Sequence, residues 1–396
     1  MTGQLSSTLD KGQSADRYNV GIDMGKNNWV MDVFDTASGK HHRHPAMGAD
    51  AAERTYARIE ALVASGREVD VIYEAGRNGF APARRLAELG TRVTVLPVNK
   101  LQVVVRGKRA KTDGIDARDL AELDSRAERC PRVWVPTVDQ ECRRRMVAEE
   151  ERLDKEVKRA NNRILSVIER WPLPSERRHR PAWGWRELVR QWRRSGCVGD
   201  GVPETEVACI ENLIRELDTA QRNLERWRKR MDRELARQRT QAGEENRPCA
   251  VDVMMQYRGI GREIALGLCW YVGDFRRFPN GDKFASYLGL VPVPWQSGTM
   301  HRDQGISKCG NTEARRLMVE LAWLWIRYQP DSAITRKWLP RLEKKGRSRK
   351  TAIVAVARQL AVALLRAVKD GVEIPGAVKN RACPAPAERP GSPLAA

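Results

Sequence analysis

The sequence predicts an α/β domain, then a long helical hairpin, then a second domain that is mostly helical. Short apolar runs alternate with helical patterns over residues 18–135, and apolar residues recur every seven positions over 140–245. Glycine-rich turns separate apolar helical segments over 250–372. A chain of 396 residues is long enough for two or three domains. The polar segment 1–17 and the Pro/Ala-rich segment 375–396 are expected to be disordered tails.

The first domain begins with an apolar run that reads as a buried strand, Asn19–Asp23, and a tight turn leads to its hairpin partner, Asn28–Asp35. Later strands alternate with helices, which predicts parallel pairing after the first hairpin. The expected later elements are a helix at Ala51–Ala64, a strand at Asp70–Glu74, a helix at Ala81–Leu89, a strand at Arg92–Leu96 and a helix from about Thr112.

The central segment carries two seams of apolar residues with heptad spacing, and two such seams predict a coiled-coil hairpin. The pairing is open, either within one chain or between chains. The prolines of residues 171–205 exclude a continuous helix through the link. The first seam is Met146, Leu153, Ala160 and Val167, with Val157, Ile164 and Trp171 offset by four; the second is Ile210, Leu217, Leu224 and Met231, with Ile214 and Leu235.

The tip of this hairpin is rich in tryptophan and arginine. Trp183, Trp185 and Trp192 lie among seven arginines between residues 177 and 194. Aromatic planes interleaved with arginines could stack on unpaired bases. Tryptophan is also usually at least partly buried, so packing of the tip or of a subunit contact is an equal alternative.

The last domain opens with a Gly-x-Gly turn, Tyr257–Gly261, followed by an apolar helix to Val272. This pattern resembles a helix-hairpin-helix element, in which the turn and a helix N-terminus present backbone N–H groups to a phosphate. Further helices are expected at Thr312–Tyr328 and Lys350–Lys369, with a basic run, Arg336–Lys350, between them.

The chain carries 71 Lys and Arg against 51 Asp and Glu, a formal charge of +20. Such a charge predicts a polyanionic partner, nucleic acid by default, although a merely basic soluble protein is the plain alternative. No apolar stretch reaches the length of a membrane span, and the first residues lack the apolar region of a secretory signal. Eight scattered cysteines without a C-x-x-C pair favour reduced thiols over zinc. A cytoplasmic, nucleoid-associated protein is expected, with no membrane partner.

Four carboxylates stand out against this basic background. Asp23 and Glu74 each end a predicted strand before a glycine-containing turn, and Asp113 and Asp116 share one face of a predicted helix. Strand ends of a parallel sheet meet at one edge, so these acids could converge there. Hard oxygen ligands suit Mg²⁺, and a pair of ions could clamp a phosphoryl displacement. Each acid taken singly also fits an ordinary turn or helix-start residue.

Two sets of motifs resemble a known family. The segments GIDMGK, IYEAG and KTDGIDARDLAEL carry the four carboxylates in the order found in the DEDD transposases of bacterial insertion sequences, the insertion-sequence one-ten family. The stretch from RGIGREIALGLCWYVGDFRRF through FASYLGLVPVPWQSG to GISKCGNTEARRLMVELAW is similar to the second transposase domain of that family. Together the matches cover about residues 18–125 and 250–330, and the central hairpin agrees with the family's architecture.

The resemblance implies a RuvC-like, RNase H-type first domain in which Asp23, Glu74, Asp113 and Asp116 bind Mg²⁺, as two ions per site. It implies that Ser297, before Gly298, is a nucleophile that forms a phosphoserine intermediate with DNA. It also implies a noncoding bridge RNA as the guide to donor and target DNA, and homodimers or homotetramers. A RuvC-like nuclease or Holliday-junction resolvase that uses water is the alternative.

The residues around Ser297 are compatible with such a role, because a glycine-flanked turn can expose a hydroxyl. Ser307 is the rival serine, and a turn residue without catalytic function is the plain reading of either. Basic residues and turn glycines near the motifs are candidates for contact with nucleic acid. They are Lys26, Arg77, Lys108, Arg109, Lys111, Arg258, Gly259, Gly261, Arg262, Arg302, Lys308, Arg315 and Arg316.

Overall fold

The computed structural model describes most of the chain as two compact units, Met1–Thr137 and Val138–Ala396, and each is considered by itself. The residues described are 16–97, 113–123, 125–127, 130, 132–170, 184–194, 202–297 and 300–380; within them, no side chain is described at 113–115, 188, 191, 192, 294–297 and 300–304.

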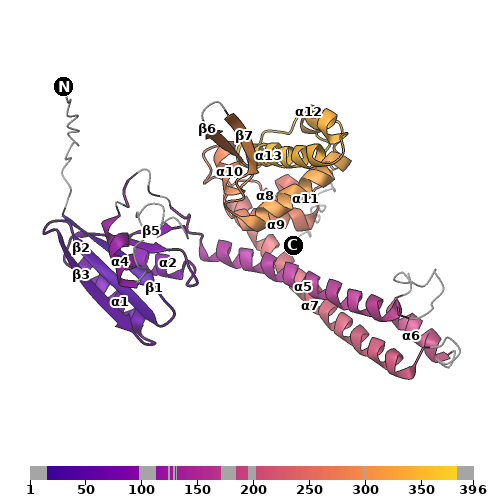
Figure 1. Cartoon of the computed structure of the whole chain (residues 1–396), viewed down its shortest axis with the longest axis horizontal. Helices are drawn as coiled ribbons and strands as arrows, with labels where there is room; N and C mark the ends of the chain where they lie inside the picture. The colour runs from indigo at the N-terminus through magenta and orange to yellow at the C-terminus, as the bar shows by residue number, and fades with distance from the viewer. Residues whose placement is uncertain are drawn as a thin grey trace, which may run out of the picture. The chain divides into compact units, whose positions relative to one another are not determined.

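The first unit holds a five-stranded sheet of order β3-β2-β1-β4-β5 (Figure 1). The strand β1 is antiparallel to β2 and parallel to β4, and β4 is parallel to β5. The predicted hairpin and the parallel pairing after it are therefore confirmed. The elements of this unit are β1 (Arg17–Met24), β2 (Asn28–Asp35), β3 (Lys40–Met47), α1 (Ala51–Ala64), β4 (Glu68–Glu74), α2 (Ala81–Glu88), β5 (Arg92–Leu96) and α4 (Asp113–Glu122).

The central strands are buried on both faces, which is why their sequences are nearly continuous apolar runs. On one face, Val20, Ile22, Val71 and Tyr73 pack with α1 and α2 in a single core. On the other, α4 covers the sheet, and its Leu120 packs against β4 and β5. The sheet thus has a helix layer on each side.

The strand β3 has no counterpart in the sequence-based prediction. Its residues, KHHRHPAM, bury only Ala46, so the pattern shows no apolar alternation. The strand is held instead by continuous antiparallel pairing to β2, from Asn28 opposite Met47 to Asp35 opposite Lys40. Backbone pairing at a polar sheet edge leaves little trace in the side chains.

The helix α4 approaches β1 so closely that only glycine fits beneath it. A Cβ atom at Gly21 would lie 2.0 Å from the carbonyl oxygen of Ala117 and 2.6 Å from the amide nitrogen of Ala121. Both are backbone atoms of a helix, so they cannot turn aside as a flexible side chain can. Gly21 therefore sets the distance between α4 and the sheet.

The second unit begins with two long helices, α5 (Val138–Ile168) and α7 (Glu204–Glu244), that pair within the chain (Figure 1). All six residues of the predicted second seam are buried in α7. The first seam is only partly right. Leu153, Ala160 and Ile164 are buried, whereas Val147 and Ile168 replace Met146 and Val167.

The shift in the first seam accompanies buried polar residues in α5. Arg143 donates to Glu234 at 2.8 Å, and Glu150 accepts from Arg228 at 2.9 Å. Arg143 and Glu150 are charged residues at buried positions, where a heptad repeat normally has apolar residues. The buried face of α5 therefore cannot be predicted from apolar spacing alone. Trp227 adds a hydrogen bond to the Met146 carbonyl at 2.9 Å.

At the far end of the hairpin, α6 (Trp185–Arg194) packs on α7. Trp185 is 3% exposed, lies in the tip core and donates its indole N–H to Asn161 at 3.1 Å. For Trp185, packing rather than base stacking is what the structure shows. Trp183 and the side chain of Trp192 fall outside the described part of the chain, so the two alternatives stay open there.

The remaining elements form a helical domain with one hairpin of strands, as predicted in outline. Side-chain caps begin several of its helices; Asn280, Asn311 and Ser332 each accept a hydrogen bond from a backbone N–H three residues on. The elements are α8 (Ala250–Met255), α9 (Arg262–Val272), α10 (Gly281–Tyr287), β6 (Pro292–Ser297), β7 (Met300–Ile306), α11 (Thr312–Tyr328), α12 (Ala333–Leu342) and α13 (Arg347–Asp370).

The helix α13 is the one described helix long and apolar enough, by length and composition, to cross a membrane. Half of its most apolar window is buried inside the protein, where it packs against α10, α11 and α12. A core helix passes the same test of composition, and this burial explains its apolar sequence.

The folded chain continues past the predicted start of the C-terminal tail at Pro375. Val378 exchanges hydrogen bonds with the side chain of Gln329, both at 2.7 Å, and accepts from the backbone of Arg258. Asn380 donates to the carbonyl of Gln256. The folded chain therefore extends to Asn380, and hydrogen bonds made by its backbone, which apolar spacing does not reveal, help to hold residues 375–380.

A methyl group added at Gly21 tests whether α4 depends on this close approach. We expect Gly21→Ala to destabilise the first unit by about 1–3 kcal/mol, since an overpacked contact must move backbone. Amide hydrogen exchange in α4 should accelerate. Gly243→Ala is the control, because nothing lies within 4 Å of its Cβ position in α7. Unchanged exchange in α4 of Gly21→Ala would contradict the argument.

Candidate functional site

Asp23 and Glu74 stand at the carboxyl ends of two adjacent parallel strands. The pairing of β1 with β4 sets Ile22 beside Tyr73, so the next residue on each strand is one of these acids. Side chains alternate along a strand, and Asp23 therefore shares a face with Gly21, and Glu74 with Ile72. That face is the one covered by α4. Both acids are half-buried.

The direction of α4 follows from contacts at its C-terminal end. After the helix, Arg126 grips the buried carboxylate of Asp70 with two hydrogen bonds, 2.6 and 3.0 Å long, near the start of β4. Glu122, in the last turn, lies 3.5 Å from His41 of β3. The C-terminal end of α4 is thus fixed away from Asp23 and Glu74, and the helix must run with its N-terminal end toward them.

The helix face toward the sheet carries the other two predicted acids. Asp116 precedes Leu120 by four residues and Asp113 precedes it by seven, so all three share a face. Leu120 packs on Ile72, and one helix turn spans nearly the rise of two strand residues, which separates Ile72 from Glu74. Asp116 therefore lies toward Glu74. The side chain of Asp113 is outside the described part of the chain.

The described side chains do not by themselves complete a metal site. Among the residues that the structure places, no three His, Cys, Asp or Glu side chains lie close enough to hold a metal ion. Asp23, Glu74 and Asp116 have the oxygen chemistry that Mg²⁺ prefers, and backbone placement brings them to one end of one face. The set thus fits a magnesium site in chemistry and in placement, and its completion rests on the first turn of α4.

Other acids of this domain are committed to structural pairs. Arg67 donates to Asp35 at 2.6 Å, and this hydrogen bond holds the pKa of Asp35 well below its usual range. Asp32 is buried with an oxygen 2.6 Å from Nδ1 of His41. Hydrogen bonds to Asp70 and Glu68 raise the pKa of Arg126 above its already high normal value. These pairs give Asp32, Asp35 and Asp70 structural roles in the sheet.

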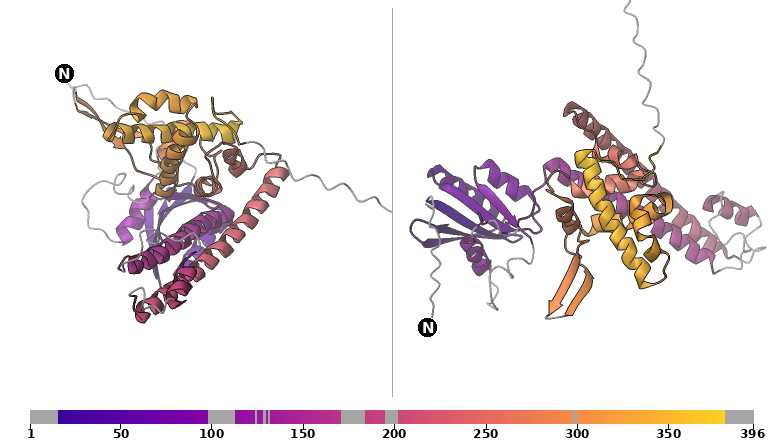
Figure 2. Two further views of the ribbon diagram at one scale, coloured as in Figure 1. Left: turned by 90° about the vertical axis from the view of Figure 1, so that its right-hand side faces the viewer. Right: turned by 90° about the horizontal axis from the view of Figure 1, so that it is seen from above.

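Ser297 is the last residue of β6, at the tip of a two-stranded hairpin. Its backbone pairs with Met300 of β7, and its side chain is outside the described part of the chain. The hairpin projects from the helices of its unit (Figure 2). The rival serine, Ser307, lies at the base of the hairpin, where its amide donates to the carbonyl of Val291 and its hydroxyl oxygen is buried. Ser297 is therefore the better placed to meet a large substrate.

The candidate contacts to nucleic acid differ in how the structure uses them. Lys26, Arg77, Arg258 and Lys308 are exposed. Lys108, Arg109 and Lys111, and the side chain of Arg302, fall outside the described residues.

The other basic candidates are engaged within the protein. Arg262 pairs with Asp232 at 2.6 Å, and Arg316 pairs with Glu151 at 2.6 Å. Arg315 donates to the backbone carbonyls of Leu288 and Lys308. These partners already occupy part of each guanidinium.

The predicted Gly-x-Gly turn joins α8 to α9. Gly259 has a positive φ of 93°, and a Cβ atom there would lie 2.9 Å from the Cβ of Tyr328. Gly261 is the residue before α9 and has open space around it. Packing explains the first glycine, and an accessible helix N-terminus is compatible with the second.

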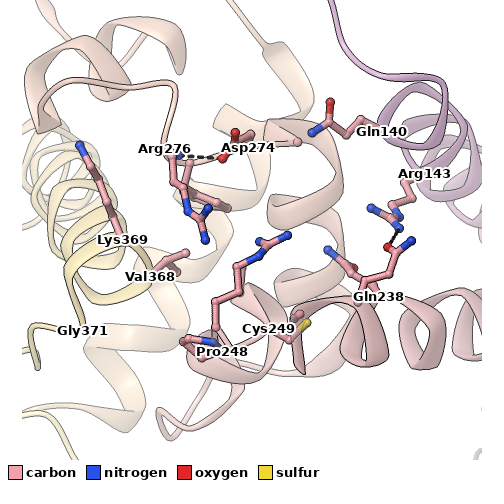
Figure 3. Close-up of a pocket in the computed structure, with 16 residues that line it drawn as sticks. Gln140, Arg143, Gln238, Pro248, Cys249, Asp274, Arg276, Val368, Lys369 and Gly371 are labelled. Atoms are coloured by element: carbon pink, nitrogen blue, oxygen red, sulfur yellow. Dashed lines mark hydrogen bonds between the residues drawn. The ribbon is translucent and has the colours of Figure 1, made fainter. Parts of the chain in front are cut away.

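A polar pocket of about 340 Å³ lies at the base of the coiled-coil hairpin (Figure 3). Its described lining includes Arg143, Arg276 and Lys369 but a single carboxylate, Asp274. Arg143 is tied to Glu234, and Lys369 donates to the Phe278 carbonyl at 3.1 Å. The described lining of the pocket therefore lacks the set of acids that metal-dependent phosphodiester chemistry needs.

Arg126 is the residue of this site that sequence reasoning missed. It lies outside the predicted motifs, but its pairing with Asp70 fixes the direction of α4. One signal was present: Asp70 is an acid inside the apolar run Val69–Tyr73. A buried carboxylate needs a hydrogen-bonded partner, so a nearby arginine could have been sought.

Known proteins resemble this chain over most of its length. Residues 251–338 match the model of the family described as Transposase IS116/IS110/IS902 family. A protein of Sinorhizobium fredii (strain NBRC 101917 / NGR234), named "Putative transposase y4rJ", is 32% identical over 393 residues, which cover 91% of this chain and 93% of the relative. The transposase for insertion sequence element IS1328 of Yersinia enterocolitica is 23% identical, covering 81% of this chain and 87% of its own.

A shorter match joins the chain to a different kind of relative. The pilin gene-inverting protein of Moraxella lacunata is 32% identical over 103 residues, 26% of this chain and 31% of that protein. The longer matches define the class of protein, which is that of the transposases. The chain belongs to the IS116/IS110/IS902 transposase family, as its sequence motifs predicted.

Two neighbouring cations separate a structural role from a binding role. We expect Arg315→Ala to destabilise the base of the β6–β7 hairpin by about 1.5–3 kcal/mol, since its hydrogen bonds to two carbonyls are charge-assisted. Lys308→Ala should leave stability unchanged and weaken DNA binding. The slope of log affinity against log salt concentration should fall by about one, the value for one lost phosphate contact. Urea unfolding and DNA titration at several salt concentrations measure both. Normal stability with lost DNA affinity in Arg315→Ala would show that Arg315 contacts phosphate instead.

Proposed function

We propose that this transposase cuts and rejoins DNA strands with a carboxylate set, Asp23, Glu74, Asp113 and Asp116, and a nucleophile, Ser297. The family makes DNA the expected substrate. The observation that carries the carboxylate part is the placement of two acids at the ends of adjacent parallel strands, beneath a helix whose N-terminal end runs toward them. A RuvC-like, RNase H-type fold of the first unit is part of the proposal, and the mixed five-stranded sheet supports it.

The four acids would hold Mg²⁺, two ions in the full arrangement. Bound there, Mg²⁺ would neutralise charge on the scissile phosphate and lower the pKa of the attacking hydroxyl. Asp23 and Glu74 are suited to this role because a sheet is a rigid support for two ligands. Asp113 and Asp116 add ligands from the helix that Gly21 allows to lie close.

The serine step balances without an outside source of energy. The Oγ of Ser297 bonds to phosphorus, the bond from phosphorus to the leaving sugar oxygen breaks, and the serine proton ends on that oxygen. Attack by a hydroxyl of the other strand reverses these changes and frees the serine. Since each DNA phosphodiester is exchanged for a serine–DNA phosphodiester, strands can be rejoined as well as cut.

A nuclease or Holliday-junction resolvase of RuvC type is the second candidate. It would use the same carboxylates and a water molecule, and would leave broken strands instead of joined ones. The position of Ser297 at a projecting hairpin tip favours the recombinase, because a hydrolase gives that hairpin no role.

A noncoding bridge RNA is proposed as the guide, with homodimers or homotetramers as the active assembly and the bacterial cytoplasm as the place of action. The support is the family together with the charge. A protein of charge +20 suits two polyanions, and phosphate contacts from Lys and Arg carry no sequence information. Base pairing with an RNA would supply the specificity that such contacts lack.

The serine can be tested against both the carboxylates and the rival serine. We expect Ser297→Ala to abolish strand exchange by at least about 10³-fold, as loss of a nucleophile does. Asp23→Asn and Glu74→Gln should do the same without loss of folding, since they keep the size of half-buried side chains. Recombination of a plasmid carrying element ends and target, with the noncoding flank supplied, is the measurement. Ser307→Ala is the matched control and should recombine normally.

A trapped adduct separates the two candidate reactions. Suicide DNA substrates should leave the wild-type protein and Ser307→Ala covalently attached to DNA, and Ser297→Ala unattached. Full recombination in Ser297→Ala would remove the serine mechanism. Cleavage without any adduct, dependent on Asp23 alone, would establish the hydrolytic alternative.

A further inference from the structure

We infer that the surface formed by α11, α12 and the start of α13 binds a single-stranded nucleic acid, with one unpaired base stacked on Trp323. The inference rests on the proposed function for its claim that the partner is DNA or RNA. It adds a binding site remote in sequence from Ser297 and from the carboxylates. The three helices pack together in the second unit (Figure 1).

An open groove of about 410 Å³ marks this surface. Its lining includes Trp323 and Ile326 of α11, Leu339 of α12, and Arg349 and Ile353 of α13. Trp323 is 47% exposed and Leu339 is 45% exposed, whereas Trp325, two residues from Trp323, is fully buried. An exposed indole beside an exposed leucine costs hydration free energy that a flat apolar ligand would recover.

The groove is bordered by cations, most of which have no ion pair among those described. Residues 336–350 contain eight Lys or Arg and one Glu. Among the described ion pairs, only Arg336 of this run has an acidic partner, Asp331 at 3.0 Å. Lys337, Lys344, Lys345 and the others are exposed or half-exposed without one, which is the arrangement expected for a polyanion site.

The coiled-coil hairpin shows the opposite use of cations. Residues 141–245 contain 25 Lys and Arg and 20 Asp and Glu, and many of these charges meet across or along the helices. Arg193 bonds Glu211 at 2.7 Å, and Arg163 bonds Glu216 at 3.2 Å. Compared with the paired arginines of the hairpin, the cations of residues 336–350 are available to bind a partner.

Arginine and tryptophan meet at the groove itself. The guanidinium carbon of Arg349 lies 5.4 Å from the centroid of the Trp323 ring. A cation near an indole can bind a phosphate while the ring face receives a base, and one nucleotide would satisfy both. Two further cations lie 5.4 Å from ring centroids nearby, Arg341 at Trp338 and Arg327 at Tyr328.

The chemistry of the groove favours a single strand over a duplex or a protein. Duplex bases are already stacked on one another, and their faces cannot reach a ring in a groove. The carboxylates of an acidic protein would pair with the cations, but they carry no flat ring to cover the exposed indole of Trp323. Phosphates and one splayed base match the cations and the ring together.

Fluorescence anisotropy of the full-length protein tests the site. The probes are labelled 12-residue oligo(dT) and oligo(rU) and a 12-base-pair duplex. We expect Trp323→Ala to weaken binding of at least one single strand about tenfold, as loss of one stacked base does, and to leave duplex affinity unchanged. Trp323→Phe should bind nearly as the wild type, because a ring remains. The strand that loses more affinity tells whether the ligand is DNA or RNA.

A second comparison tests the cations of the groove. Lys345→Ala/Arg349→Ala should weaken single-strand binding and reduce its salt dependence, whereas Lys155→Ala, an exposed cation of α5, should change neither beyond the loss of one dispersed charge. Circular dichroism melting must show each variant folded.

Three results would overturn the inference: wild-type single-strand affinity in folded Trp323→Ala, equal loss for strand and duplex, or a changed oligomeric state with unchanged affinity, which would make the groove a protein contact. Each result is independent of strand exchange. Failure of Ser297→Ala to block recombination would sink the proposed chemistry and leave the binding result standing.

Discussion

The contact of α4 with Gly21 is the constraint on which the candidate site depends. Two strand-end acids on a sheet are common, and they become a site only if a third group approaches the same end of the same face. A helix backbone resting directly on a strand brings its side chains about as near as a helix can come. The acids repel one another until a cation binds, so they cannot draw α4 toward the sheet. The missing Cβ atom of Gly21 is what allows the helix, and with it Asp116, to lie close.

The direction of that helix is fixed at its opposite end. Asp70 is buried and would destabilise the sheet without a cationic partner; Arg126 donates to it at 2.6 Å and Arg17 lies 3.7 Å away, so Arg126 contributes to stability as well as to orientation. One ion pair thus links stability to the geometry of the site.

Sequence patterns predicted the parts of the fold whose signal lies in apolar side chains. The runs around Val20 and Val71, the seam through Leu224 and the helix at Thr312–Tyr328 were all found. The strand β3 was missed and the tail at Pro375 misjudged, since both are held by backbone hydrogen bonds that side chains do not reveal. The predicted first seam is wrong at Met146 and Val167, in a helix where Arg143 and Glu150 occupy buried positions. The acids of the site could be predicted as strand ends, but not the closeness of α4, because glycine marks turns as often as contacts.

The net charge of the chain divides into two populations with different physical roles. Cations such as Arg193 and Arg262 face carboxylates of the same chain, and each pair adds little stability but leaves little field at a distance. Cations such as Lys344 and Lys345 have no such neighbour among the described residues, so their field reaches a partner over roughly one Debye length. A count of +20 treats the two alike. Salt should therefore weaken binding chiefly through the unpaired group, while the paired group holds the helices in place over the same range of salt.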